Sequence, residues 1–531
     1  MLLLTTFVRN IFMETNVMIE LTFLKKLREK IYNAFPIRRD ANMNLLDALS
    51  SYGPRAKSVV ELSESPYFER QYSSITDGIA DGLHSAKWQD IKQEVFEEAH
   101  NSSDDRIVMI TDCTPSKRPT ANCLEDRHVT YSPNPAPGNK PICIGHEYSV
   151  VAMLPSDKAS QNQHWLLPLS TRRVKSHEKG NEVGMQQIRD CIEQLSLSNK
   201  LVISLADSKY ATEPCRKIAA QYPNWVHICR LNSTRKIYKS AQSDYSGKGN
   251  KKRYGEAMKL NDPETHFDAD ETVKKMIITR SGRCLEVTIR IWKDQLIRGS
   301  KGFKGYQHPM NVAQITATDN KGRSIYKNSL WISISGDRRH EISAEEVYHY
   351  YDSRYDIEHY FRFGKDKLLF DSYQTPDVVH EEAWWQLTAV AYCQLYFARK
   401  HVALLPKKWE RYLPIFKKND QKDFIATPSQ TQRGFYQLLD EIGTPAATCR
   451  PRGNPQGRQL GEVQPKRERQ PIHFKKKAEK IDTRSIISGS EETINLPDPK
   501  KIDQLVKSIK TRLKNIGCSM ENFQEKLRNA A

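Results

Sequence analysis

The sequence lacks the long apolar segments that membrane-spanning proteins need. No run of about 18 apolar residues occurs, and 27% of the 531 residues are charged, which excludes a polytopic membrane protein. Glycine shows no repeat of period three and no heptad pattern is sustained, which excludes collagen-like and coiled-coil classes. The length predicts roughly two to four domains, with ample material for a buried core.

Signals for zinc, disulfides, ATP and secretion are missing as well. The ten cysteines form no CxxC pair and no zinc-ribbon spacing, so we expect reduced thiols in a cytoplasmic protein. No GxxxxGK[ST] loop occurs, so nothing supports ATP-driven action. Residues 1–7 are apolar, but Arg9 follows at once without a small-residue cleavage site, so we expect no secretory signal. Met13 and Met18 are alternative starts.

Positive charge is concentrated in two segments. The chain has 82 Lys and Arg against 64 Asp and Glu, a net charge of +18, and residues 230–260 and 446–484 carry +7 each. Both segments are rich in Gly, Pro, Ser and Gln, which predicts loops or arms. Basic arms are typical of proteins that bind phosphate backbones, so we expect a nucleic-acid partner. The alternative is that both are solvated linkers.

The hydrophobic pattern separates an all-α part from an α/β part. In residues 20–102 apolar side chains recur at three-to-four spacing, which predicts helices, among them 40–50, 56–63 and 87–99. Short apolar runs then predict five strands, at 106–111, 146–154, 164–169, 201–206 and 225–229. Helices are predicted at 181–197 and 211–221, so the pattern indicates a mixed sheet with flanking helices.

The second half of the chain begins with a β-rich insertion. Alternating stretches in 231–341 predict strands, and one long helix is predicted from Ser343, as N-cap, to Leu368. Further helices are expected at 381–400 and 501–530. We therefore expect five regions: a helical, DNA-binding domain, the first part of an α/β core, an insertion, the second part of the core, and a basic C-terminal region. Their bounds are 20–102, 103–230, 231–341, 342–400 and 401–531.

Two aspartates stand where apolar runs end. Asp112 follows RIVMIT and Asp207 follows LVISLA. A carboxylate at a strand end sits on rigid backbone at the sheet margin, which suits a metal ligand. Two such groups and a further oxygen ligand can hold a pair of divalent ions for phosphoryl transfer. The alternative is that each aspartate is a turn or N-cap residue.

The segment YYDSRYDIEHYFRFGKDK has charged and phenolic residues at helical spacing. Tyr351, Arg354, Glu358 and Lys365 stand at offsets of 0, 3, 7 and 14, which on one helix fall within a stripe of roughly 60°. A carboxylate for metal beside cations for phosphates suits cleavage of a DNA strand. The alternative is a surface helix with ion pairs.

This Y-(2)-R-(3)-E-(6)-K signature follows the two aspartates, with the β-rich insertion between Asp207 and Glu358. In this arrangement, residues 106–370 resemble the DDE transposases of insertion-sequence family four and their close relatives. The residues before each aspartate, Ile110-Thr111 and Leu205-Ala206, fit that family's strand endings. The resemblance implies an RNase H-like core that cuts and rejoins DNA at the ends of mobile elements.

The resemblance also implies roles for single residues. The implied ligands of two Mg²⁺ ions, replaceable by Mn²⁺, and the implied catalytic residues are Asp112, Asp207 and Glu358. The implied DNA contacts are Tyr351, Arg354, Lys365 and Arg230. Trp331 matches the place of a tryptophan that stacks on a flipped base, the alternative being a core tryptophan.

We therefore expect a cut-and-paste DNA transposase that cleaves at insertion-sequence ends and transfers the strands into target DNA. The expected partners are double-stranded DNA, both terminal inverted repeats and target, and a second copy in a homodimer, without a membrane. The expected location is the prokaryotic cytoplasm, at the nucleoid. Two alternatives stay open: an RNase H-like nuclease without strand transfer, and a catalytically inactive, transposase-derived DNA-binding protein.

Other residues are weaker candidates for the site. His227 and Cys229 resemble a ligand pair, but the strand pattern around them favours burial. Asp352 and Asp356 are alternative carboxylates, yet they turn about 100° and 140° away from Tyr351 on a helix. Lys367 breaks the spacing of the signature.

Overall fold

The computed structural model describes the chain between residues 21 and 474. The segments within this range that fall outside the description are 53–54, 101–102, 133–140, 242–250, 281, 301, 403–404, 406, 409–424, 450–458 and 464–465. The helix predicted at 501–530 and parts of both basic segments also lie outside the described residues.

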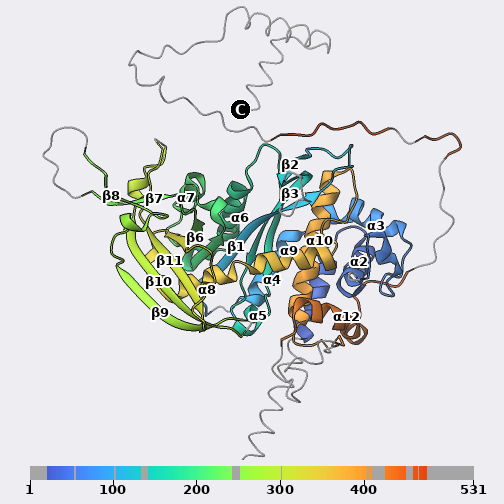
Figure 1. The fold of residues 1–531 in the computed structure, drawn as a ribbon. Helices are drawn as coiled ribbons and strands as arrows, with labels where there is room; N and C mark the ends of the chain where they lie inside the picture. The colour runs from blue at the N-terminus through green and yellow to red at the C-terminus, as the bar shows by residue number, and fades with distance from the viewer. Residues whose placement is uncertain are drawn as a thin grey trace, which may run out of the picture. The chain divides into compact units, whose positions relative to one another are not determined.

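A ten-stranded sheet forms the centre of the described chain (Figure 1). Its strands lie in the order β2 (His128–Tyr131), β3 (Ile142–Met153), β1 (Arg106–Lys117), β5 (Leu201–Ala206), β6 (Trp225–Leu231), β12 (Leu330–Ser335), β11 (Met310–Asp319), β10 (Cys284–Gln295) and β9 (Glu271–Ile278), with β4 (Leu167–Val174) paired to β3. β1, β5 and β6 are parallel, and the other pairs are antiparallel. The mixed sheet predicted from the sequence is confirmed.

Helices cover both faces of this sheet. α6 (Gly180–Gln194) packs on β1, β3 and β4, and its Gly180 approaches the side chain of Glu147 in β3. On the other face, Trp385 of α10 (Val378–Ala398) stacks on Tyr148, with ring centroids 4.1 Å apart. Neighbouring side chains of a strand point to opposite faces, so the two helices sandwich β3. The shorter helices of the core are α5 (Lys158–Asn162), η4 (Leu197–Asn199), η5 (Ser208–Tyr210) and α7 (Glu213–Ala219).

The N-terminal part is all helical, as predicted. Residues 21–34 form a helix, followed by α2 (Arg39–Tyr52), η1 (Val60–Glu64), α3 (Ser73–Asp77), η2 (Gly78–Gly82), η3 (Leu83–Ser85) and α4 (Trp88–Ala99). In place of the helix predicted at 56–63 there is only the short 3₁₀ helix η1. The buried Arg28 guanidinium donates to Asp47 of α2 at 2.6 Å and to Gln394 of α10 at 2.6 Å. This shared ion pair joins the N-terminal helices to α10, and α12 (Pro428–Ile442) packs on both α2 and α10.

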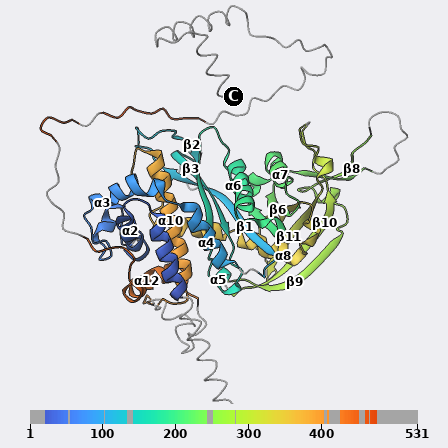
Figure 2. The same ribbon diagram turned by 180° about the vertical axis from the view of Figure 1, so that it is seen from behind.

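The β-rich insertion extends the central sheet and does not form a sheet of its own. Its four strands β9–β12 join through β12, which pairs with β6. Only the hairpin of β7 (Lys236–Ser240) and β8 (Tyr254–Lys259) stands apart, with η6 (Pro263–Thr265) and η7 (Gly305–Gln307) nearby in the chain. From behind, β9–β11 lie at one end of the molecule and the helices α2, α3 and α12 at the other (Figure 2).

The long helix predicted from Ser343 to Leu368 is interrupted. η8 (Arg339–Glu341) precedes α8 (Ala344–Ser353), whose N-cap Ser343 forms a capping box with Glu346, as the sequence predicted for the cap. α9 (Asp356–Lys367) follows after Arg354 and Tyr355. There the Ile357 and Glu358 N–H groups bond to carbonyls three residues back, at 3.4 and 3.0 Å. A tightened turn therefore separates the two halves of the signature.

A segment from the C-terminal region lies along β2, the strand at the edge of the sheet. His473 donates to the Arg127 carbonyl at 2.7 Å, Val129 donates to the His473 carbonyl at 3.0 Å, and a parallel bridge joins His128 to His473. Upstream, Gln470 donates to the Asn122 carbonyl at 2.8 Å. We call residues 466–474 the C-terminal arm; it partly pairs the otherwise open edge. Among the described helices, none is long and apolar enough to cross a membrane.

Candidate active site

The parallel strands β1 and β5 bring the two aspartates side by side. Pairing of β1 with β5 ends at Ile110, which lies opposite Leu205, and each aspartate stands two residues further along its strand. Asp207 follows β5, as predicted. Asp112 does not end its strand, because β1 continues to Lys117 as the antiparallel partner of β3. The aspartates therefore stand where β1 diverges from β5.

The electrostatics of Asp112 show that the two carboxylates interact. Burial, together with the negative charge of Asp207, raises the pKa of Asp112 to about 6. The Cys113 N–H, which donates to Asp112 Oδ1 at 2.8 Å, and the charges of Arg354 and Lys209 act in the opposite direction. Two carboxylates that repel each other in a partly buried site are stabilised by a cation between them. Asp207 is also an N-cap, since its Oδ1 accepts the Lys209 N–H at 2.8 Å.

Arg354 connects Asp112 with Glu358. Its Nη1 lies 4.0 Å from Asp112 Oδ2 and its Nη2 lies 3.2 Å from Glu358 Oε1. The guanidinium also packs over the Tyr355 ring, 4.4 Å from the centroid, and near Tyr351, at 5.6 Å. The Arg354 side chain is only 7% exposed, whereas that of Glu358 is 49% exposed. One buried cation thus interacts with two of the three predicted carboxylates.

The donor set is of the kind that hard divalent cations prefer. Asp112, Asp207 and Glu358 offer carboxylate oxygens, which suit Mg²⁺ or Mn²⁺. In the part of the chain that the structure describes, however, no three His, Cys, Asp or Glu side chains are grouped closely enough to hold a metal ion. The structure therefore brings Asp112 and Asp207 together and links Glu358 to them through Arg354. Direct convergence of all three carboxylates stays a prediction.

The remaining signature residues lie close to this centre. Lys365 Nζ donates to the Pro115 carbonyl of β1 at 2.7 Å, and burial lowers the pKa of Lys365. Burial raises the pKa of Tyr351, while the charges of Arg354 and Arg230 oppose that rise. Arg230, exposed on β6, is therefore near the Tyr351 phenol. Along the two helices Tyr351 and Arg354 are buried, whereas the Glu358 side chain is about half exposed.

Trp331 is placed in the core, which contradicts an exposed base-stacking position. It is 3% exposed, and its ring lies 5.4 Å from Trp292 and 5.4 Å from His266, between centroids. The face of β12 that carries Trp331 is covered there by Trp292 of β10 and by His266. The alternative considered from the sequence, a core tryptophan, is the observed one.

Of the weaker candidates, His227, Cys229 and Asp356 are buried, whereas Asp352 is exposed and lies 3.6 Å from Arg280 Nε. His227 Nδ1 bonds to Ser204 Oγ at 2.8 Å and burial lowers the pKa of His227 to about 4, while Cys229 Sγ lies 3.2 Å from Ser333 Oγ. His227 and Cys229 each contact a serine hydroxyl, so they do not form the metal-ligand pair that their spacing resembled. Asp356 is fully buried, with its Oδ1 2.6 Å from His164 Nδ1 and 2.6 Å from Arg280 Nη1, so this carboxylate is already paired.

Sequence reasoning missed Lys209 and Tyr131. The Lys209 ammonium acts on Asp112 and lies 5.2 Å from the centroid of the Tyr131 ring, which is 55% exposed. An exposed aromatic ring and a cation thus stand beside the aspartates, a combination that binds nucleic-acid strands. The only sequence signal was a lysine two residues after Asp207.

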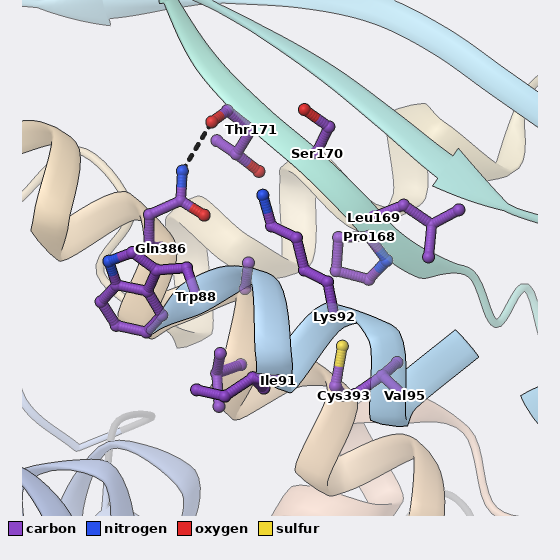
Figure 3. A pocket seen from close by; sticks show the side chains of 12 residues that line it. Trp88, Ile91, Lys92, Val95, Pro168, Leu169, Ser170, Thr171, Gln386 and Cys393 are labelled. Atoms are coloured by element: carbon purple, nitrogen blue, oxygen red, sulfur yellow. Dashed lines mark hydrogen bonds between the residues drawn. The ribbon is translucent and has the colours of Figure 1, made fainter. Parts of the chain in front are cut away.

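The small cavity between α4, β4 and α10 does not belong to this site. It has a volume of about 20 Å³, room for about one water molecule. Figure 3 shows Lys92 extending from α4 toward β4, where Gln386 Nε2 donates to the Thr171 carbonyl at 2.6 Å. None of its lining residues is one of the carboxylates or cations described above.

Comparison with known families supports a nuclease-type core. Residues 30–292 match the family model described as DDE superfamily endonuclease. This match spans Asp112 and Asp207 and ends before α8. It supports a DDE transposase-like family, an enzyme that acts on DNA phosphodiester bonds, and divalent metal ions, which such domains generally use. The mixed sheet with flanking helices is consistent with the expected RNase H-like fold. No curated protein matches the chain.

Proposed function

We propose that the chain is a DNA transposase that cleaves double-stranded DNA at the ends of an insertion sequence and joins the freed ends to target DNA. The observation that carries the proposal is the pair Asp112 and Asp207 at equivalent positions of adjacent parallel strands, with Arg354 between Asp112 and Glu358. Carboxylates beside a cation support the proposal, because these are the groups that bind and cut a phosphodiester.

Each residue has a role in this proposal. Asp112, Asp207 and Glu358 would hold two Mg²⁺ ions, which supply an activated nucleophile and stabilise the leaving oxygen. Arg354, Tyr351 and Arg230 would bind the DNA backbone at the scissile bond. Lys365 would keep α9 against β1, through its hydrogen bond to Pro115, and so hold Glu358 near the aspartates. A homodimer would react two ends together, at the nucleoid of a prokaryotic cell.

A strand-transfer assay tests the proposal. The DNA substrate is taken from inverted repeats flanking the reading frame, labelled and supplied both intact and pre-cut. With Mg²⁺ the parent protein should cut the intact end and join the pre-cut 3′ end to a target plasmid. Asp207→Asn should do neither and still bind the duplex. Asp190→Asn on α6, where Asp190 pairs with its neighbour Arg189, should behave as the parent.

The same assay separates the alternatives. Cutting without joining of the pre-cut end would identify a nuclease that lacks strand transfer. The parent protein could instead bind the duplex, keep its Mg²⁺-dependent thermal shift, and neither cut nor join DNA. That result would identify a catalytically inactive, transposase-derived DNA-binding protein. Neither outcome is compatible with a cut-and-paste transposase.

A further inference from the structure

A larger cavity lies in the helical part of the molecule, between the end of α2, the residues just after η1, and α12. Its volume is about 460 Å³, within the range of roughly 300–1,000 Å³ that small-molecule sites occupy. None of its lining residues lies on β1, β5, α8 or α9. It is therefore separate from the carboxylate site.

Three tyrosine rings line this cavity: Tyr52, Tyr67 and Tyr436. Two of their hydroxyls are already used, since Tyr52 donates to Glu64 at 3.3 Å and Tyr67 donates to Asp440 at 2.7 Å. What these two side chains offer to a ligand is the ring surface. Aromatic rings at such a density favour a flat, aromatic ligand.

Two arginines supply positive charge to the same wall. Arg55 lies over the Tyr52 ring, 5.7 Å from its centroid, and forms no ion pair among the described residues. Arg433 is anchored by its Nε, which donates to the Leu405 carbonyl at 3.2 Å. Guanidinium groups bind phosphate through paired hydrogen bonds better than a point charge does, so the ligand carries a phosphate or a similar anion.

We propose that this cavity binds one nucleotide unit, with its base against the tyrosine rings and its phosphate on Arg55 and Arg433. The unit is either a free nucleotide or an unpaired nucleotide of a DNA strand, because both carry the same groups. The site is distinct from the carboxylates and does not depend on the reaction they carry out.

Calorimetric titration of the full chain, without divalent metal, tests the site. The probes are dAMP, deoxyadenosine and inorganic phosphate. We expect dAMP to bind at least about tenfold more tightly than either fragment, because only dAMP engages the rings and the arginines together. Equal binding of dAMP and phosphate, or no binding of dAMP at millimolar concentration, would overturn the proposal.

Variants assign the binding to this cavity. Arg55→Ala and Tyr436→Ala, both at solvent-accessible side chains, should each weaken dAMP about tenfold and keep the parent's melting temperature. Arg39→Ala is the matched control, because Arg39 lies over the Tyr32 ring at 5.1 Å outside the cavity. It should leave dAMP binding unchanged, and a loss equal to that of Arg55→Ala would overturn the proposal.

A short adenine single strand distinguishes the two sources. If it binds tighter than dAMP, and Arg55→Ala removes that advantage, the occupant is a nucleotide of a DNA strand. If dAMP binds at least as well as the strand, and Arg55→Ala still weakens dAMP, the occupant is a free nucleotide. With saturating duplex ends, Arg55→Ala should cleave DNA at the parental rate. The dAMP titration needs no DNA cleavage, so a protein that is not a transposase could still pass or fail it.

Discussion

Asp112 is buried beside Asp207 where β1 and β5 diverge, and both the burial and the negative charge of Asp207 make its ionised form costly. Because the pKa of Asp112 is raised to about 6, its ionised form at pH 7.5 destabilises the folded state, by up to about 3 kcal/mol. Asp112→Asn removes this charge. We expect a higher melting temperature without divalent metal, and no DNA cleavage with it.

The effect of Mg²⁺ on the melting temperature tests Asp112→Asn more sharply. Millimolar Mg²⁺ should raise the melting temperature of the parent and of Asp190→Asn, since a ligand that binds only the folded state stabilises it. Asp112→Asn should show little of this shift. An equal Mg²⁺ shift in both variants would place the cation elsewhere on the protein.

Lys92 is a second residue at which burial opposes charge. Burial lowers its pKa, and among the described residues it has no ion pair. The unfolded chain therefore binds more protons than the folded one between the lowered pKa and 10.5, so this group makes stability rise with pH in the alkaline range. Lys92→Met should raise the free energy of unfolding at pH 7 by about 1–3 kcal/mol and flatten that rise.

Urea unfolding at pH 7 and pH 9 checks this prediction. Lys26→Met, at an exposed position of the first helix, should change neither the stability nor its pH dependence. Suppose instead that Lys92→Met lowers the free energy of unfolding at pH 7. The Lys92 ammonium then has a favourable partner in solution, such as a water molecule in the cavity of Figure 3.

The turn between α8 and α9 changes what the sequence alone would predict for Arg354. An exposed stripe would let Arg354→Ala fold with an unchanged melting temperature. In the structure Arg354 is buried between Asp112, Glu358 and two tyrosine rings. We therefore expect Arg354→Ala to lose about 1–3 kcal/mol of stability as well as DNA cleavage.

A matched set of variants separates stability from function in this turn. Arg354→Lys keeps the charge and should recover part of the stability but little cleavage, because lysine lacks the planar fork that contacts both carboxylates. Arg362→Ala, at an exposed position of α9, should leave both unchanged. If Arg354→Ala cleaves DNA at the parental rate, the signature has no catalytic role and its match to the family is a coincidence.

Several elements were predictable from the sequence for definite reasons. β5 and β6 are fully or nearly fully buried apolar runs, and such runs between polar residues predict strands directly. The last part of β1, CTPSK, was not predictable, because it is polar and contains Pro115. It is a strand only because β3, far along the chain, pairs with it. Likewise, nothing local shows that Trp292 and His266 pack on the ring of Trp331 and bury it.

The candidate site was predictable as a set of residues and not as an arrangement. Asp112, Asp207 and the signature face could be named because strand ends and helical spacing are local properties. The role of Arg354 between two carboxylates depends on how α9 packs on β1 and α8 on β6, β10 and β11. The proximity of Lys209 to Asp112 depends on the pairing of β5 with β1. Such packing is a tertiary property that periodicity does not encode.

At the scale of the whole molecule, the two basic segments should dominate binding to DNA of any sequence. Replacing Lys466, Arg467 and Arg469 of the exposed arm by alanine should weaken all duplexes alike. The slope of log affinity against log salt should fall by about 0.9 for each DNA phosphate that the variant no longer neutralises. Fluorescence anisotropy across a salt titration measures this slope. An unchanged slope would make the arm a solvated linker.

The pairing of the C-terminal arm with β2 also bears on how the protein is made. His473 follows His128 by 345 residues. A ribosome adding about 5–20 residues per second therefore completes β2 roughly 20 to 70 s before it supplies the strand that covers it. During that interval the nascent chain presents a bare β-edge, the surface that recruits chaperones or neighbouring nascent chains. Messages truncated before the arm should therefore yield protein that aggregates on the polysome, even though every residue proposed for chemistry has already been translated.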